Sequence, residues 1–424
     1  MARLDALPVE LLCDIFQYVH DSCESSNDLF SVSLLCRKYY PVARDVLYKA
    51  PRLLQPKPTD DRKWYYRRRH QLRSLLRTTI SQPHLAKQIG ELEVTVALRS
   101  SHWTPRTPAD LGTIDVENET VQSLPCTSAD WTARICSGDE AATCALILGL
   151  IPSLRRLSLN AVKMCHSFAQ DEDYFVNQAP RIYDWFDFSP GSFDTSEIAG
   201  LKNLLSIKSD EWYPRCLLNI PTIEAIELSE PHFSFGLHQR PLSNVSSVTL
   251  HSDHYSTESL NHWQQWAHVM AESMFLNLQY LPRLETLHLI VTGSVDQDSA
   301  DDRFGDYPYP LMAPNLRTFI YDTRAVFHHG EVHIPRPSPI ETCFVHLLQG
   351  FAEANNTPQL EKVEMWPGLY QGDSESAFAF PDTLHTWSDQ FTMYTGDKDS
   401  LKRVENGEVS SDAVWPHRIV YLKD

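Results

Sequence analysis

The chain has 424 residues, more than one hydrophobic core usually supports, so we expect two domains or one long repeat array. Its 42% hydrophobic and 22% charged residues are typical of a soluble globular protein, and no stretch approaches the roughly 18 apolar residues of a membrane span. The formal net charge of −18 argues against binding to nucleic acid or to anionic membranes, because an acidic surface repels phosphate groups.

That charge is divided unevenly along the chain. Residues 1–90 hold 15 lysines and arginines against 9 aspartates and glutamates, whereas the remaining residues hold 22 against 46. The larger part of the chain is therefore strongly acidic. It favours a basic partner if the acids gather on one face, and the alternative is that the charge only aids solubility.

The N-terminus and the cysteines indicate the compartment. Charged residues, among them Arg3, Asp5 and Glu10, stand where a signal peptide would have its apolar core. The 9 cysteines contain no Cys-x-x-Cys pair, which argues against a disulfide framework and a zinc ribbon. We therefore expect reduced thiols, no cofactor, and a cytoplasmic or nuclear protein.

The first fifty residues predict a unit of three short helices. Pro8 suits a first helical position, and Glu10 lies in the first turn, where the helix dipole favours an acid. Asp28 and its neighbours can cap a second helix, and Pro41 ends that helix and can open a third. The first helix has one broad apolar face, formed by Leu11, Leu12, Ile15, Phe16 and Val19.

Such a small unit can hardly bury all the apolar side chains that it carries, because a domain of about 50 residues hides only a modest share of its surface. Something else must cover the remaining apolar face. One possibility is a helical cap that packs on the rest of the chain, and the other is a separate protein.

The same residues resemble the F-box family, whose helices dock on the Skp-type adaptor of a cullin-RING ubiquitin ligase. The resemblance covers roughly residues 4–50 and includes Leu7-Pro8-x-Glu10-Leu11-Leu12-x-x-Ile15-Phe16-x-Tyr18-Val19, Asp28-Leu29, Leu35-Cys36-Arg37-x-Tyr39, Ala43 and Leu47-Tyr48. It implies an adaptor interface with these residues at it or beside it: Leu7, Pro8, Leu11, Leu12, Ile15, Leu35, Cys36 and Tyr39.

A connector and a basic helix follow. The segment from Pro51 to Arg62 carries three prolines and two adjacent aspartates, which is typical of a connector. Over residues 63–81, apolar residues form one helix face, and Arg69, Arg73 and Arg77 form another at steps of four. We interpret the arginines as a solvated face that pairs with acidic neighbours, with nucleic-acid binding as the alternative.

One short frame then recurs: proline, any residue, apolar, two residues, apolar, any residue, apolar. The last two apolar residues of each copy alternate with other residues, which predicts a short strand with both side chains on a buried face. Copies begin at Pro152, Pro221, Pro282, Pro314 and Pro358, copies without the proline at Ile89 and Val245, and Leu201 to Ile207 fits after a shift of one residue.

Helical patterns over residues 140–150, 258–281 and 342–354 precede several copies. A helix followed by a short strand is a repeat unit whose apolar face is covered only when units stack, as in a solenoid. The pattern resembles degenerate leucine-rich repeats with long insertions, and the order of the parts resembles fungal F-box proteins.

We therefore expect an α+β or α/β repeat fold in three parts. Residues 1–50 form an F-box-like helical domain, residues 51–84 the connector and basic helix, and residues 85–424 an irregular leucine-rich-repeat-like domain for substrate recognition.

The insertions between copies interleave aromatic and acidic residues, as in residues 183–188 and residues 296–309. Acids beside aromatic rings suit a peptide that carries lysine or arginine. The alternative is that these loops pack on the edge of the array. We expect target binding by Asp184, Trp185, Asp187, Asp306 and Tyr307.

The sequence contains no phosphate-loop, dinucleotide-binding, nucleophile-elbow or His-Glu-x-x-His motif. His251 with His254, and His328 with His329 and His333, are interpreted as ordinary histidines, since neither group has the ligand pattern of a metal site. The resemblance thus implies a non-catalytic substrate-recognition subunit of an SCF-type ligase, which binds an adaptor, a cullin scaffold and a target protein. The alternatives are a non-degradative F-box scaffold and an enzyme of an unrecognised fold.

Overall fold

The structure is a computed structural model in which the chain forms two compact units, residues 1–223 and residues 224–424. The boundaries predicted at residues 50 and 84 both lie inside the first unit. The structure describes residues 7–22, 39–53, 61–98, 140–163, 199–209, 220–229, 244–254, 281–295, 314–328, 357–366, 391–397, 400–403 and 418–423.

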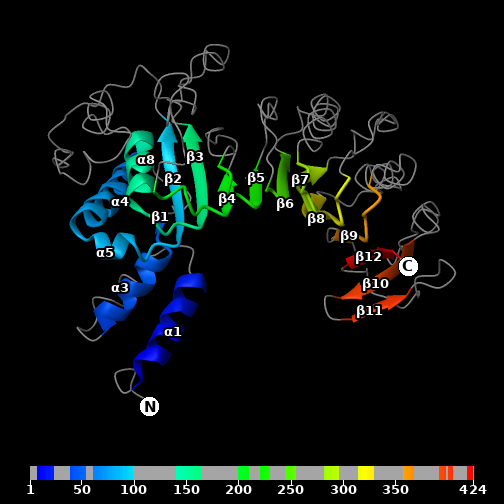
Figure 1. The fold of residues 1–424 in the computed structure, drawn as a ribbon, viewed down its shortest axis with the longest axis horizontal. Helices are drawn as coiled ribbons and strands as arrows, with labels where there is room; N and C mark the ends of the chain where they lie inside the picture. Colours follow the sequence, from blue (N-terminus) through cyan, green and yellow to red (C-terminus); the bar gives the residue numbers. More distant parts are fainter. Residues whose placement is uncertain are drawn as a thin grey trace, which may run out of the picture. The chain divides into compact units, whose positions relative to one another are not determined.

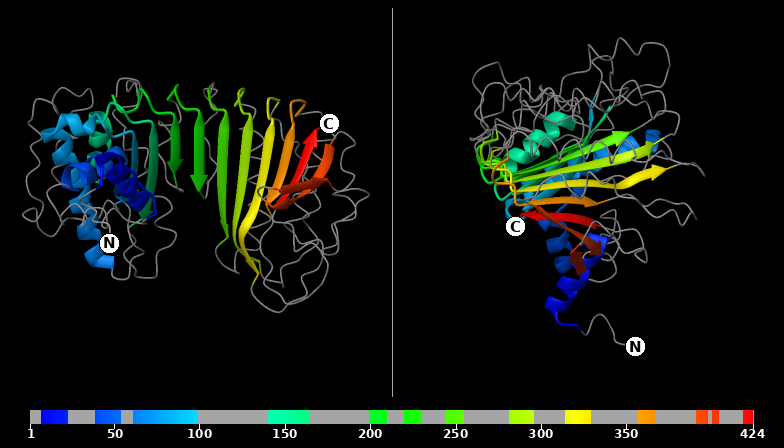
Figure 2. Two further views of the ribbon diagram at one scale, coloured as in Figure 1. Left: turned by 90° about the horizontal axis from the view of Figure 1, so that it is seen from below. Right: turned by 90° about the vertical axis from the view of Figure 1, so that its right-hand side faces the viewer.

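The first unit combines helices with a parallel sheet. Its described helices are α1 (Val9–Ser22), α3 (Tyr39–Lys49), α4 (Asp61–Ser81), α5 (Pro83–Ala86) and α8 (Glu140–Leu150). Its described strands are β1 (Arg52–Leu53), β2 (Glu91–Leu98), β3 (Arg156–Lys163) and β4 (Ser206–Ser209). The strands pair in parallel in this order, so β1 is the neighbour of β2 and β4 the neighbour of β3 (Figures 1 and 2).

Two of the three predicted N-terminal helices correspond to α1 and α3. The first helix begins at Val9, and the carbonyl of Pro8 accepts its first hydrogen bond from the Leu12 N–H at 3.1 Å. The third begins at Tyr39 with Pro41 in its first turn, where a proline removes no helical hydrogen bond. The predicted second helix lies outside the described residues.

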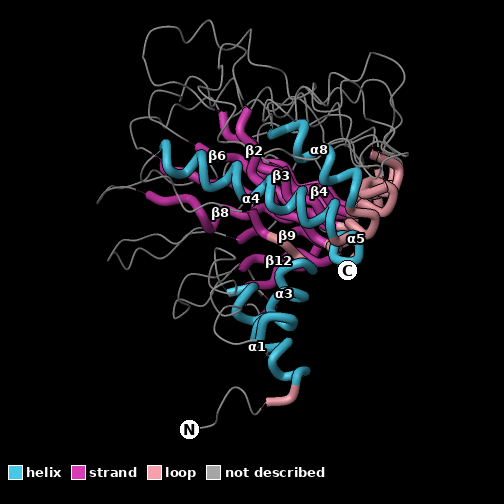
Figure 3. The backbone as a smooth tube through the Cα atoms, turned by 90° about the vertical axis from the view of Figure 1, so that its left-hand side faces the viewer, coloured by secondary structure: helices cyan, strands magenta, loops and turns pink. Residues whose placement is uncertain are grey.

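The predicted basic helix is α4, which packs against α8 (Figure 3). The expectation that its arginine series is solvated is wrong for Arg73, which is only 6% exposed, although Arg77 is exposed. Tertiary packing of α4, which contacts α8, α5 and β1, decides this burial, and sequence spacing alone does not show it. The predicted connector is also shorter than expected, since Arg52 and Leu53 form β1.

The second unit is described through its strands. They are β5 (Ala225–Ser229), β6 (Ser247–His254), β7 (Thr286–Val295), β8 (Thr318–His328), β9 (Lys362–Trp366), β10 (Phe391–Asp397), β11 (Ser400–Arg403) and β12 (Arg418–Lys423). The first five pair in parallel, and β12 is inserted antiparallel between β9 and the β10–β11 hairpin (Figures 1 and 2).

The recurring frame forms a turn followed by a strand. In the copy that begins at Pro282, the Leu284 N–H donates to the Leu281 carbonyl at 3.0 Å, which places the proline at the second position of a tight turn. Proline favours that position because its ring fixes φ near the value that common turns require there. Each copy of the frame leads into one of the strands from β2 to β9.

Backbone hydrogen bonds repeat from one turn to the next. The Ser246 carbonyl accepts from the N–H groups of Glu285 and Thr286 at 2.8 and 2.9 Å. The Glu285 carbonyl in turn accepts from Arg317 and Thr318 at the same two distances. Mixed α/β content with parallel-rich sheets is therefore confirmed. The leucine-rich-repeat architecture stays a prediction, because the helices predicted over 258–281 and 342–354 lie outside the described residues.

One face of the second unit's sheet is an apolar core. Strand residues at alternate positions are almost fully buried there, namely Ile226, Leu228, Val248, Leu250, Leu287, Phe319, Tyr321, Val363, Met365, Ile419 and Tyr421. The Tyr421 phenol is buried on this face, and this burial raises its pKa. The period-2 prediction of buried strand faces is thus confirmed for β5 to β9, whereas β12 was not among the predicted strands.

The opposite face carries one densely paired carboxylate. Glu364 of β9 is 3% exposed, and Arg418 of β12 binds both of its oxygens, Nη2 to Oε1 at 2.8 Å and Nε to Oε2 at 2.9 Å. The Trp366 indole N–H donates to Oε2 at 2.8 Å, and Lys362 binds Oε1. Burial raises the pKa of Glu364, but the hydrogen bonds from Arg418, Lys362 and Trp366 outweigh it and lower that pKa to about 2.

We predict that Gly200→Ala destabilises the first unit. A Cβ at Gly200 would lie 2.0 Å from the Leu148 carbonyl oxygen and 2.7 Å from the Ile151 carbonyl oxygen, so the backbone must shift. We expect a loss of about 2 kcal/mol in the free energy of unfolding, measured by denaturant titration. Gly90→Ala is the matched control, because no atom lies within 4 Å of its added Cβ. Equal stability of the two variants would contradict the prediction.

We also predict that the Glu364 carboxylate stabilises the second unit in a pH-dependent way. Because its pKa falls from 4.5 to about 2 on folding, the stabilisation is complete above about pH 4.5 and is lost as the pH falls towards 2. We expect Glu364→Gln to cost about 3 kcal/mol at pH 7 and less at pH 3, measured by thermal melting. Glu361→Gln, at an exposed ion pair with Arg317, should retain the wild-type pH dependence.

Candidate adaptor-binding surface

Helix α1 has two apolar sectors, one buried and one exposed to solvent. Leu12 and Phe16, four residues apart, are 0% and 2% exposed. Leu11, Ile15 and Tyr18 also recur at helical spacing, yet they are 48%, 38% and 73% exposed. The helix therefore has an apolar sector inside its domain and a second one that stays accessible.

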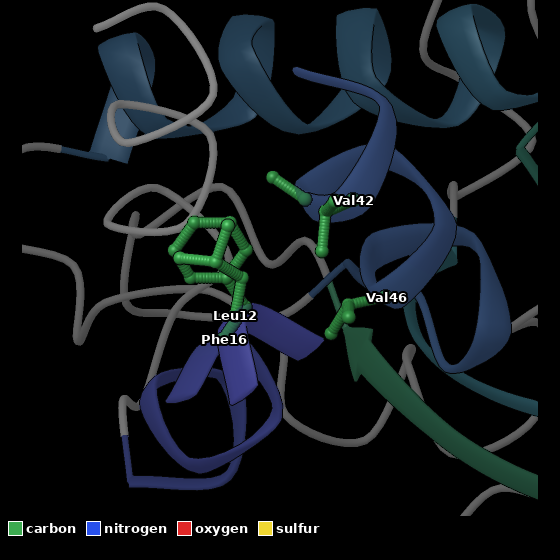
Figure 4. Close-up of a cluster of buried hydrophobic side chains, with 5 residues drawn as sticks. Leu12, Phe16, Val42 and Val46 are labelled. Carbon is green, nitrogen blue, oxygen red and sulfur yellow. The ribbon is translucent and has the colours of Figure 1, made fainter. Parts of the chain in front are cut away.

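The buried sector meets α3. Leu12 and Phe16 of α1 pack with Val42, Ala43 and Val46 of α3 (Figure 4). The Phe16 ring also meets the Tyr39 ring edge to face, with centroids 5.9 Å apart and an interplanar angle of 85°. This core fixes how α1 rotates about its own axis, and it thereby decides which side chains remain outside.

The accessible sector continues to the start of the helix. Pro8, three residues before Leu11, is exposed as well. We call Pro8, Leu11, Ile15 and Tyr18 the apolar stripe. Val9 is 51% exposed but lies outside the stripe. It stands two positions before Leu11, and residues two positions apart in a helix point about 200° away from each other. A contiguous row of accessible apolar side chains on one helix is the usual form of a helix-borne docking surface.

The eight residues that the F-box resemblance implies for the adaptor interface fall into different environments. Pro8, Leu11 and Ile15 lie on the apolar stripe. Leu12 does not, because it is part of the α1–α3 core. Leu7 and Tyr39 are partly buried against that core, while Leu35 and Cys36 lie outside the described residues. The adaptor role of all eight stays a prediction.

Tyr18 and Tyr40 are exposed aromatic residues of α1 and α3 that the F-box resemblance did not place at the adaptor interface. Tyr18 lies seven residues after Leu11 and three after Ile15, so helical spacing places it on the same side of α1 as these two residues. Tyr40 of α3 is 51% exposed, and the Arg44 guanidinium lies 5.9 Å from its ring centroid. Arg44 also pairs with Asp45 at 3.1 Å, so this side of α3 is polar and aromatic.

The predicted target-binding residues, Asp184, Trp185, Asp187, Asp306 and Tyr307, all lie outside the described residues. Among the described residues, no group of three or more histidine, cysteine and acidic side chains could hold a metal ion. His251 instead meets Glu227, with Nε2 2.7 Å from Oε1. No helix in the described part of the chain is both long and apolar enough to span a membrane.

We predict that Leu12 and Leu11 differ sharply in their effect on stability. Leu12→Ala removes a fully buried side chain and should lower the free energy of unfolding by about 2–4 kcal/mol. Leu11→Ala removes an exposed one and should change it by less than about 0.5 kcal/mol. Denaturant unfolding of the two variants measures this difference, and a large loss for Leu11→Ala would show that the stripe is part of the core.

Comparison with known families adds to this geometry. The sequence model of the F-box-like family matches residues 4–53, which contain α1, α3, β1 and the whole apolar stripe. No curated protein matches the chain. The match covers the N-terminal part alone, so the family of the remaining residues is not shown by it. The chain therefore carries an F-box-like domain at its N-terminus, and α1 is its first helix.

Proposed function

We propose that the chain is a substrate-recognition subunit of an SCF-type cullin-RING ubiquitin ligase. The F-box-like domain at residues 4–53 supports this role, because F-box domains bind a Skp-type adaptor and F-box proteins are in general non-catalytic adaptors. The apolar stripe on α1 is the observation that carries the proposal. It is an accessible apolar surface inside the matched residues, and a Skp-type adaptor is the partner that the match implies.

The physical basis of this binding is the burial of apolar surface. Leu11, Ile15 and Tyr18 leave between 38% and 73% of their surface in water, and removing such area contributes about 25 cal/mol per Å². Tyrosine is among the residues that most often dominate interfaces, so Tyr18 is expected to be an anchor. The α1–α3 core keeps the stripe ordered before binding, which lowers the entropic cost of association.

The rest of the chain would then bind the target protein. In this proposal the repeat sheets and their insertions hold a target, and the ligase supplies the chemistry. The contribution of the chain is effective concentration, because it keeps a target lysine near the charged ubiquitin carrier. The acidic composition after residue 90 favours a basic target segment.

We predict that Leu11→Asp or Ile15→Asp abolishes adaptor binding without unfolding the chain. Each change places a carboxylate in a surface that must lose water on binding, which costs several kcal/mol. Both positions are accessible in the free protein, so the cost should be small there. Co-purification of full-length chain with a recombinant Skp-type adaptor measures binding, and circular dichroism measures folding.

Val9→Asp is the matched control for these variants. It also introduces aspartate at an exposed apolar position of α1, but outside the apolar stripe. We expect it to bind the adaptor as the wild type does. Retained binding by both Leu11→Asp and Val9→Asp would contradict the proposed surface. Equal loss of binding in both variants would show that the contact is not confined to the apolar stripe.

The same purification separates the ligase role from a non-degradative scaffold. Recovery of the adaptor together with cullin supports the ligase subunit. Recovery of the adaptor in repeated absence of cullin supports a scaffold that uses the F-box-like domain for another assembly. Absence of the adaptor itself refutes both.

A further inference from the structure

We propose that Arg52 couples α1 to strand β2, so that an adaptor bound at the apolar stripe also stabilises the first strands of the sheet. Arg52 is then a positioning residue: it touches neither adaptor nor target, and it acts by holding α1. This inference concerns the proposed adaptor site and rests on the proposed function for its physiological meaning. The contacts that carry it lie inside the first unit.

Two hydrogen bonds join the end of α1 to the segment that enters β1. The His20 Nε2–H donates to the Ala50 carbonyl at 2.8 Å. The Arg52 Nη1–H donates to the His20 carbonyl at 2.9 Å. His20 is 2% exposed and the Arg52 side chain is 26% exposed, so the two bonds are partly shielded from water, and a polar group that loses its partner there has a desolvation cost.

The Arg52–His20 bond satisfies a specific need of the helix. The last four carbonyls of a helix have no partner within it, and His20 belongs to the last turn of α1. A cation at a helix C-terminus is also favoured by the helix dipole, so an arginine there binds better than a neutral donor. Arg52 therefore acts as an external cap on α1 although it belongs to a strand.

The same segment is bound to β2 on its other side. Arg52 is paired with Glu93 in the parallel register of β1 and β2, and its Nε lies 3.9 Å from Glu93 Oε2. The Glu93 N–H donates to the Pro51 carbonyl at 3.1 Å, and the Gly90 N–H to the Lys49 carbonyl at 3.0 Å. One arginine thus contacts both the end of α1 and strand β2.

This arrangement predicts reciprocal coupling. Opening of β1 away from β2 displaces Arg52 and leaves the His20 carbonyl without this donor. Conversely, an adaptor that holds α1 in place makes this opening rarer, and by linkage it protects the strand. A flexible connector between helices and sheet would transmit no such effect.

Hydrogen exchange on the full chain tests this, with a recombinant Skp-type adaptor as the probe. We expect the adaptor to slow amide exchange in α1, and also in residues 91–98 of β2, by roughly threefold or more. In Arg52→Ala the protection of α1 should remain while that of β2 is lost. Arg52→Lys, which keeps the charge but has a single nitrogen in place of the fork, should be intermediate.

Arg156→Ala is the matched control. Arg156 also forms an ion pair with a glutamate of β2, Nη1 to Glu91 Oε1 at 3.1 Å, but it belongs to β3. Its removal should leave the protection of β2 by the adaptor unchanged. A general weakening of the sheet by loss of any surface ion pair would instead affect both variants equally.

The outcomes separate this inference from the proposed function. Protection confined to α1 and α3 in the wild type, or protection of β2 that persists in Arg52→Ala, overturns the coupling while adaptor binding stands. If the adaptor does not bind, the proposed function fails and the coupling is tested alone with Leu12→Ala, which loosens the α1–α3 core. Exchange in β2 of that variant that rises more than exchange in β3 (Arg156–Lys163) of the same unit supports the coupling, and an equal rise in both strands, or no change, overturns it.

Discussion

The first unit depends on one geometric constraint, the angular width of the apolar sector on α1. Leu11 and Leu12 are adjacent, so they point about 100° apart, and a single packed neighbour covers only one of these directions. The core with α3 takes the Leu12 and Phe16 side, which leaves Leu11, Ile15 and Tyr18 accessible. Because the buried row packs against α3, it sets the direction in which the accessible row faces. Stability and recognition are thus divided between two rows of the same helix.

The sheets follow a second constraint, which is local. The turn with proline at its second position, at Pro282, is followed by a carbonyl that accepts from two consecutive N–H groups of the next copy, since Glu285 accepts from Arg317 and Thr318. Each turn therefore sets the register of the next strand, and the apolar pair of every frame falls on the same face. The series ends where β12 enters antiparallel beside β9. There Arg418 faces Glu364, so the change of strand direction coincides with the most heavily paired carboxylate of the described residues.

The parts of this fold that follow from local sequence could be predicted, and the parts that follow from tertiary contact could not. The frames around Pro282 and Pro314 predict β7 and β8 because turn proline and alternation act over a few residues. The spacing around Arg73 indicates a helix, but it does not indicate that Arg73 is buried or that α8 packs on this helix. Likewise, the F-box motif in α1 contains both Leu11 and Leu12. Only the position of α3 shows that Leu12 is buried and Leu11 is accessible.

The junction at residues 49–53 joins the F-box-like domain to the sheet by direct contacts. Composition suggests a loose connector after Pro51, yet Pro51 and Arg52 are already bound to β2 through the Glu93 N–H and the parallel register. Strand β1 has only two residues and forms few hydrogen bonds itself, so its position depends on its contacts with α1 and β2. Helix α1 is thus held at two places: its side packs on α3, and its last turn is bound to Ala50 and Arg52, which directly follow α3 in the chain. A domain boundary drawn after residue 50 would cut these contacts, because the cap of α1 lies two residues beyond it.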